Sequence, residues 1–322
     1  MCDIQDLAAL AHLWTMGCTL AIDNIEISFC CAFIMELWQR QIIDDKDISA
    51  WVGEAVSFEW GSYEAGVRVI ESIALQQNTL GRIFKDGIYE AAKRIEEIKG
   101  VNVLKYVSYG KGGMPVIADA RTNPSWAVSM AVASRGADHL KGAAATVERF
   151  FRPDISIESF GRAEAAEFGT PTLKGQDCAR AENRCAIVNS LGICSLLVVA
   201  DTILYPTRLF AGALTACFGV EVTAQDLEVA GERTVNLEKA FNSRVGLRRE
   251  DDRLGERPMN EPPVEGPKKG VVLADYFEPM KDEYYEAHGW DVETSLQTRR
   301  KLEDLGMSDI ADVLTKDRAI VI

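Results

Sequence analysis

The chain has 322 residues, of which 47% are hydrophobic, 26% charged and 8% aromatic, a composition typical of a folded globular protein rather than a disordered or fibrous one. Its net charge of −14 argues against nucleic-acid binding, because phosphate recognition requires a surface rich in Lys and Arg. The start, MCDIQDLAAL, carries acids where a signal peptide has Lys or Arg, and no uncharged run reaches the ~18 residues of a membrane span. We therefore expect a cytoplasmic protein with no membrane and no nucleic-acid partner.

Helical spacing of apolar residues dominates the first hundred positions. Asp3 is expected to cap a first helix. Residues 24–41 are apolar nearly all round, which predicts a buried core helix. Residues 62–77 and 87–100 repeat the helical period, and Gly100 is expected to end the second of these helices.

The pattern breaks at residues 101–124, VNVLKYVSYGKGGMPVIADARTNP, where turn residues replace the helical period and leave room for a short strand or two. We place a domain boundary here, between residues 1–107 and 108–322. Helices are expected to resume at residues 125–136, and Thr223 with Asp226 resembles a capping box. The expected apolar face of the helix that follows consists of Leu227, Ala230, Thr234, Leu237 and Phe241.

Residues 244–270 are charged and rich in proline, so they are expected to form a long surface loop, ordered if its Arg/Asp pairs dock. Two short helices are predicted to close the chain, with Gly306 as a C-cap. The sequence therefore predicts a mainly α protein in two parts.

Two short stretches share one form. CTLAID (Cys18 to Asp23) and NSLGIC (Asn189 to Cys194) each place a Leu, a small residue and an Ile beside a hydrophobic helix. None of the eight cysteines forms a C-x-x-C pair, so a zinc ribbon or a self-contained ferredoxin has no support. Most of the cysteines are expected in the core, and Cys178 and Cys185, whose spacing to Cys194 matches no cluster pattern, are expected to be helix-core or surface cysteines rather than metal ligands.

One histidine lies among charges. In SRGADHLKG, His139 has Arg135, Asp138 and Lys141 as neighbours at the end of an apolar helix. This pattern fits a solvated helix C-terminus, where cations favour the dipole. It also fits a clamp for an anion or a cofactor, with His139 able to transfer a proton near neutral pH.

Five blocks in order carry a family resemblance: GADHLKG, NSLGIC, GERTVNLEKAFNSRVGLRREDDRLGERP, DEYYEAHGWD and KLEDLGMSDI. Together they resemble the C-terminal half of the aldehyde ferredoxin oxidoreductase family, over almost the whole chain. The resemblance implies two helical domains like domains 2 and 3 of that family, with its β-rich N-terminal domain absent. It also implies a tungsten (or molybdenum) bis-pyranopterin, one [4Fe–4S] cluster and an optional Mg²⁺.

The resemblance assigns roles to residues. Cys194 matches a cysteine that ligates the cluster, and Asn189, Ile193 and Ser195 match residues that line one pterin. Cys18, Ile22 and Asp23 match the other pterin site. The remaining matches are Arg135 and Lys141, which would contact the cofactor, and His139, a candidate catalytic residue near the metal that would donate a proton or orient the substrate.

Three departures from the family bear on these roles. Asn189 and Cys18 stand where the family has Asp, and both accept fewer hydrogen bonds than a carboxylate. Ala21 replaces a glycine of the first motif. The other cluster cysteines and a Glu near the metal match nothing here, which leads us to expect a separately encoded N-terminal piece.

Two functional hypotheses remain. The first is the cofactor-binding portion of an oxidoreductase that oxidises aldehydes to carboxylic acids and passes electrons through the cluster to ferredoxin; a homodimer is compatible with it. The second is a catalytically inactive helical remnant or scaffold subunit of the same family.

Overall fold

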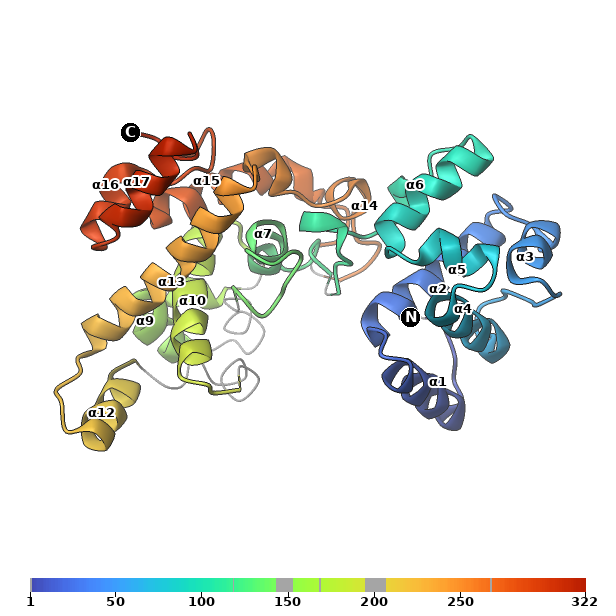
Figure 1. Ribbon diagram of the computed structural model, residues 1–322, viewed down its shortest axis with the longest axis horizontal. Coiled ribbons are helices and arrows are strands. Elements are labelled where there is room, and N and C mark those ends of the chain that lie inside the picture. Colours follow the sequence, from blue (N-terminus) through green and yellow to red (C-terminus); the bar gives the residue numbers. More distant parts are fainter. Residues whose placement is uncertain (1, 118, 143–152, 168, 195–206, 267) are drawn as a thin grey trace. The chain divides into compact units, whose positions relative to one another are not determined.

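The computed structural model describes residues 2–117, 119–142, 153–167, 169–194, 207–266 and 268–322 (Figure 1). Helices make up most of this part of the chain, and its β structure is limited to isolated bridges such as Tyr109 with Pro115. The prediction of a mainly α fold is confirmed. In the same residues, no helix is both long and apolar enough to cross a membrane.

The chain divides into two compact units. Unit 1 comprises Met1–Tyr109, Gly113–Ile117 and Gly255–Arg257, and unit 2 comprises Gly110–Gly112, Ala118–Leu254 and Pro258–Ile322. The assignment of residues 1–107 and 108–322 to two separate domains of the family stays a prediction.

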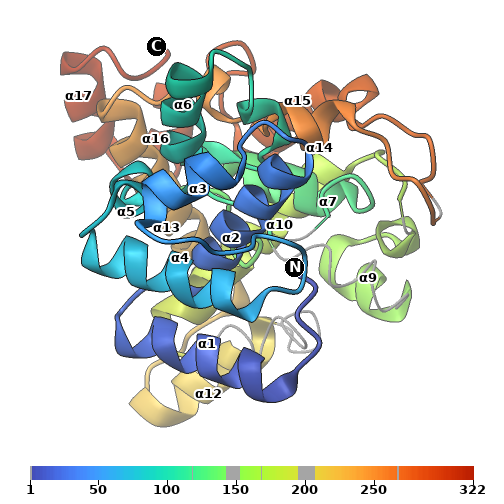
Figure 2. The same cartoon turned by 90° about the vertical axis from the view of Figure 1, so that its right-hand side faces the viewer.

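Unit 1 is a cluster of helices joined by short turns (Figures 1 and 2). Its elements are α1 (Leu7–Thr19), α2 (Asn24–Gln39), α3 (Asp45–Val52), α4 (Tyr63–Leu75), α5 (Thr79–Phe84), α6 (Ile88–Lys99) and the 3₁₀ turn η1 (Leu104–Tyr106). As predicted, α2 is a core helix, with Ile34, Met35 and Leu37 fully buried. Gly100 ends α6 in the left-handed conformation, as predicted, at φ 69°.

The prediction for the first cap was wrong. Helix α1 begins at Leu7, and the carboxylate of Asp6 accepts hydrogen bonds from the backbone N–H groups of Ala8 and Ala9. Asp3 lies too far upstream to reach them and adopts a left-handed backbone conformation instead. The cap therefore sits three residues later than the sequence pattern indicated.

Unit 2 is built around a long helix, α10. Its helices are α7 (Pro124–Val132), α9 (Pro153–Phe160), α10 (Lys174–Ser190), α12 (Thr207–Phe218), α13 (Ala224–Arg244), α14 (Glu256–Asn260), α15 (Phe277–His288), α16 (Arg299–Asp304) and α17 (Ser308–Lys316). Its 3₁₀ turns are η2 (Lys111–Gly113), η3 (Ala163–Ala166), η4 (Arg249–Asp251) and η5 (Leu273–Asp275); η2 and α14 extend across the unit boundary.

Glycines allow the helices of unit 2 to cross closely. A Cβ atom on Gly231 of α13 would lie 2.3 Å from the backbone oxygen of Asn183 on α10. A Cβ on Gly175 of α10 would lie 1.9 Å from the backbone oxygen of Met280 on α15. The backbones of α13 and α15 therefore touch α10 directly at these two points.

The stretch 244–270 is not simply a surface loop. Asp252 is buried, and its carboxylate lies 2.5 Å from Lys111 Nζ and accepts a hydrogen bond of 2.7 Å from the Tyr285 hydroxyl. Lys281 Nζ donates to the Asp252 carbonyl at 2.9 Å, and Lys239 Nζ lies 3.8 Å from its carboxylate. Asp252 in this Arg/Asp-rich stretch is thus a buried acid, and it anchors the stretch by pairing with buried lysines.

Helix α13 has a different buried face from the one predicted. Leu227 is buried as expected, but Leu237 and Phe241 are exposed. The inward face carries Val235, Asn236 and Lys239 together with other small and polar residues, and the elements that face Asn236 and Lys239 supply their hydrogen-bond partners, Gln297 and Ser295. The capping box of Thr223 and Asp226 is confirmed.

Candidate cofactor site

The two stretches with matching sequences form the same kind of helix-ending turn. Helix α10 ends at Ser190, and the N–H of Ile193 donates to the carbonyl of Val188 at 3.2 Å. Helix α1 ends at Thr19, and the N–H of Ile22 donates to the carbonyl of Gly17 at 2.9 Å. This six-residue closure is the Schellman motif, which ends a helix by placing one residue in the left-handed conformation.

Gly192 and Ala21 are these left-handed residues, with φ of 70° and 55°. A Cβ on Gly192 would meet nothing within 4 Å, so its backbone conformation, rather than crowding by protein atoms, favours glycine here. Gly192 therefore lies just beyond the end of α10, and it does not weaken the helix interior.

The turn after α10 offers its polar groups to solvent. Asn189 and Cys194 are exposed, whereas Ile187 and Val188 just before them are buried. Across the described parts of the chain, no side chain hydrogen-bonds to the Asn189 amide or the Cys194 thiol. Ser195 lies outside the described residues. An exposed thiol at a fixed turn fits one ligand of an iron–sulfur cluster.

The turn after α1 is more occupied. Asp23 is exposed, but one oxygen of its carboxylate caps α2 by accepting from the N–H groups of Ile25 and Glu26, each at 2.8 Å. The Cys18 sulfur accepts a hydrogen bond of 3.3 Å from the amide of Asn24. Ile22 in the same turn is partly buried. The first turn therefore has one carboxylate oxygen of Asp23 left for a ligand.

The segment after α7, which contains Arg135, His139 and Lys141, is held by ion pairs with carboxylates, one of them on α13. Arg135 pairs with the buried carboxylate of Asp138, which also accepts from the N–H of Leu140 at 2.8 Å. Lys141 Nζ lies 2.6 and 2.8 Å from the two carboxylate oxygens of Glu238 on α13. Both cations therefore have a counter-charge, but the Arg135 side chain is largely exposed and can also meet an anion, whereas the Lys141 side chain is mostly buried.

His139 lies between these two ion pairs in the chain and is partly buried. Burial lowers its pKa, the nearby charge of Asp138 opposes this, and Arg135 lowers the pKa further. The imidazole is therefore neutral at pH 7 and can accept a proton. Sequence reasoning missed Glu238, because its pairing with Lys141 spans 97 positions and leaves no local pattern.

Among the described residues, no group of three or more His, Cys, Asp or Glu is placed to hold a metal, and the exposed cysteines are Cys18, Cys194 and Cys217. Cys178 and Cys185 lie buried in α10, as expected for core residues. Burial raises the pKa of Cys178 well above its usual value, which disfavours the thiolate that a metal requires. The residues present thus fit part of a cluster and pterin site, because they provide one thiolate for a cluster and exposed polar groups for a pterin.

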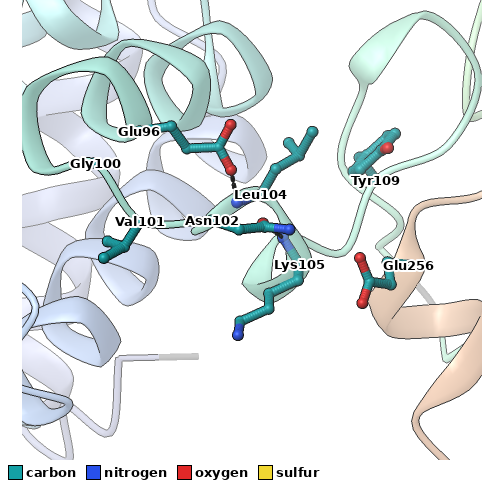
Figure 3. Close-up of a pocket in the computed structure, with 8 residues that line it drawn as sticks. All are labelled: Glu96, Gly100, Val101, Asn102, Leu104, Lys105, Tyr109 and Glu256. Carbon is teal, nitrogen blue, oxygen red and sulfur yellow. Dashed lines mark hydrogen bonds between the residues drawn. The ribbon is translucent and has the colours of Figure 1, made fainter.

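A separate polar hollow of about 380 Å³ lies in unit 1, and Glu96, Lys105, Tyr109 and Glu256 are among the residues that line it (Figure 3). Glu96 is used structurally, since its carboxylate accepts from the N–H groups of Val103 and Leu104, each at 2.9 Å. None of the residues assigned by resemblance lines this hollow.

Comparisons with known proteins agree with the family resemblance and the fold. Residues 1–307 match the family described as aldehyde ferredoxin oxidoreductase, domains 2 & 3. The chain is 28% identical to the tungsten-containing aldehyde ferredoxin oxidoreductase of Pyrococcus furiosus over 95% of its own length and 46% of that protein, and 27% identical to that of Thermococcus kodakarensis over the same shares. The chain therefore spans about half the length of the curated relatives it matches.

Two further likenesses are more distant. Over 39% of this chain and 19% of the relative, it is 31% identical to the WOR-like subunit of an aliphatic sulfonate oxidoreductase of Pyrococcus furiosus. The fold resembles a chain of the active-site complex BamBC of benzoyl coenzyme A reductase, with a TM-score of 0.67 at 18% identity over 91% of this chain and 45% of that one. The chain belongs to the aldehyde ferredoxin oxidoreductase family and corresponds to its domains 2 and 3.

Proposed function

We propose that the chain is the cofactor-binding portion of a tungsten or molybdenum pterin oxidoreductase that oxidises aldehydes to carboxylic acids and passes electrons through a [4Fe–4S] cluster to ferredoxin. The observation that supports this most is the pair of matching helix-end turns, one carrying Asp23 and the other Cys194. Two turns of one geometry fit a cofactor with two pterins, each turn presenting its backbone and polar groups to one of them.

Each residue has a defined task under this proposal. Cys194 would supply one thiolate to the cluster, while Asn189, Ile193 and Ser195 would line the pterin beside it. Cys18, Ile22 and Asp23 would line the second pterin, with Asp23 accepting through the carboxylate oxygen that does not cap α2. Arg135 would neutralise an anionic group of the cofactor, because it is exposed beside the buried Asp138.

The bound cofactor would supply the two-electron chemistry of the metal. The protein's own contribution to proton transfer would be His139, whose neutral imidazole can take up a proton released as the substrate is oxidised. Lys141 would hold this segment in place through Glu238 rather than bind the cofactor phosphate alone. The buried residues that precede Cys194 would exclude water from one side of the cluster.

A complete site needs more thiolates than the described residues offer. The other half of the family's length would supply them, either from further residues of the same polypeptide or from a second chain. Ferredoxin would be the electron acceptor, and Mg²⁺ would be an optional further cofactor.

A scaffold without catalysis is the alternative function. It is favoured by the first turn, where Cys18 stands in place of the family's Asp and its sulfur already accepts a hydrogen bond from Asn24. In this reading the helical fold would persist to hold a partner, and the cofactor would be lost.

Metal analysis distinguishes the two. The chain, tagged and purified from its native host under anaerobic conditions with whatever accompanies it, should contain tungsten or molybdenum and about four iron atoms per chain. Metal at background level would support the scaffold and overturn the oxidoreductase.

A further inference from the structure

A cavity in unit 1 brings two cysteines of distant sequence position together. It has a volume of about 540 Å³ and lies among α1, α2 and α4. Its apolar wall includes Leu10, Leu13, Trp14, Ile27, Val69 and Ile70. Cys2, before α1, and Cys31, on α2, line the same cavity.

The two thiols lie on the same part of the cavity wall. Cys2 Sγ donates a hydrogen bond of 3.6 Å to the carbonyl of Ser28, which lies three residues before Cys31 on α2. The backbone at Cys2 is also held, because its carbonyl accepts from the N–H of Gly61 at 2.8 Å. The thiols therefore stay together without a large movement of the chain.

Their environments differ in the way that thiol–disulfide exchange requires. Cys2 is partly exposed, and the hydrogen bond from Cys31 lowers its pKa against the opposing effect of burial. Cys31 is buried, and its contact with Cys2 together with burial raises its pKa well above the usual value. Cys2 is thus the better nucleophile and the more accessible to a reagent.

We propose that Cys2 and Cys31 form a redox-active dithiol that a low-molecular-weight disulfide, such as glutathione disulfide, converts to an intramolecular disulfide. The Cys2 thiolate attacks one sulfur of glutathione disulfide, forming a mixed disulfide and releasing one glutathione thiolate, which takes up the proton lost by Cys2. Cys31 then attacks the Cys2 sulfur of the mixed disulfide, and the second glutathione leaves with the Cys31 proton. Two electrons pass from the protein thiols to glutathione disulfide, which becomes two glutathione molecules.

The bond would change the cavity. Residues 2–5 line one side of it, and a Cys2–Cys31 link would join this segment covalently to α2. The N-terminal wall would then be fixed, and the cavity would admit an apolar molecule less readily. The cavity adjoins the first turn, because Asn24 and Ile25 line it, but neither Cys2 nor Cys31 belongs to a proposed cofactor turn, and the thiol chemistry can be tested without the cofactor.

Peptide mapping tests the proposal. The full chain is equilibrated anaerobically in glutathione buffers of increasing disulfide content, its free thiols are alkylated, and it is digested with chymotrypsin, which can cut after Trp14 and Phe29 to separate the sites. We expect a linked peptide pair containing Cys2 and Cys31, a mass lower by two hydrogens, and recovery of both thiols on reduction.

Two matched variants sharpen the result. Cys2→Ser should abolish the linked peptide, whereas Cys30→Ala, which removes the neighbouring buried thiol on the same helix, should leave its yield within about twofold. Cys31→Ser should stop the reaction at the glutathione adduct on Cys2. A persistent adduct in the unmodified chain, a link to Cys30, or no loss of thiols at any buffer ratio would each overturn the proposal.

Discussion

Ala21 and Gly192 occupy the same position in two helix-end turns, two residues after the last helical residue, and both have left-handed backbones, with φ of 55° and 70°. An alanine pays a steric cost in this conformation that a glycine does not. The turn at Ala21 is therefore less stable than the turn at Gly192, although both turns have the same hydrogen-bonding pattern.

This inequality predicts mutations of opposite sign. Ala21→Gly should raise the free energy of unfolding by about 0.5–1 kcal/mol, and Gly192→Ala should lower it by about 1 kcal/mol. Urea unfolding followed by circular dichroism measures both. Ala11→Gly, within the exposed face of α1, is the control and should cost about 1 kcal/mol. A loss of stability in Ala21→Gly similar to that control would show that the turn is not left-handed.

The crossing of α10 and α13 predicts a larger effect. In Gly231→Ala the new methyl group would meet the Asn183 carbonyl at 2.3 Å, so the two helices must separate. The free energy of unfolding should fall by about 2–3 kcal/mol, as for other overpacked positions. Gly212 on α12 has open space around its Cβ position, and Gly212→Ala should stabilise the protein by up to about 1 kcal/mol. Equal effects of the two substitutions in urea unfolding would contradict the close crossing.

The buried lysine near Asp252 predicts a pH dependence. Burial lowers the pKa of Lys239 to about 8, while the charge of Asp252 opposes this shift. Between that value and the pKa of about 10.4 in the unfolded chain, the unfolded state binds the proton more tightly. The free energy of unfolding contributed by Lys239 therefore rises as the pH rises through this window.

The difference in unfolding free energy between the unmodified chain and Lys239→Met isolates this contribution. It should shift by about 2 kcal/mol in favour of the unmodified chain between about pH 7 and pH 9.5. The exposed Lys269→Met controls for the removal of one positive charge. A difference that stays constant, or that shifts the other way, would show that the Lys239 ammonium is not penalised by burial.

Local chemistry made much of the fold predictable. The capping box at Thr223 and the terminal Gly100 depend on residues a few positions apart, and both were predicted correctly. The outward orientation of Phe241 depends on what α13 meets in three dimensions, and the helical period alone chose the wrong face. The burial of Asp252 was not predicted for the same reason: its sequence neighbours are charged, as on a surface, and its partners Lys111 and Tyr285 are far away in sequence.

The candidate site divides in the same way. The shared form of the stretches ending at Asp23 and Cys194 reflects a local hydrogen-bonding pattern, so the sequence contained it. The pairing of Lys141 with Glu238 is long-range, so no local pattern predicts it, and the cofactor contact expected of Lys141 stays a prediction.

The iron content of Cys194→Ala tests directly whether Cys194 ligates an iron–sulfur cluster. The tagged chain is purified anaerobically from its native host in three forms, unmodified, Cys194→Ala and Cys217→Ala, the last being another exposed cysteine. The account predicts about four iron atoms per chain in the unmodified and Cys217→Ala forms and a loss of most of that iron in Cys194→Ala, with the helical circular dichroism unchanged. Equal iron in all three forms would contradict the assignment of Cys194 as a cluster ligand.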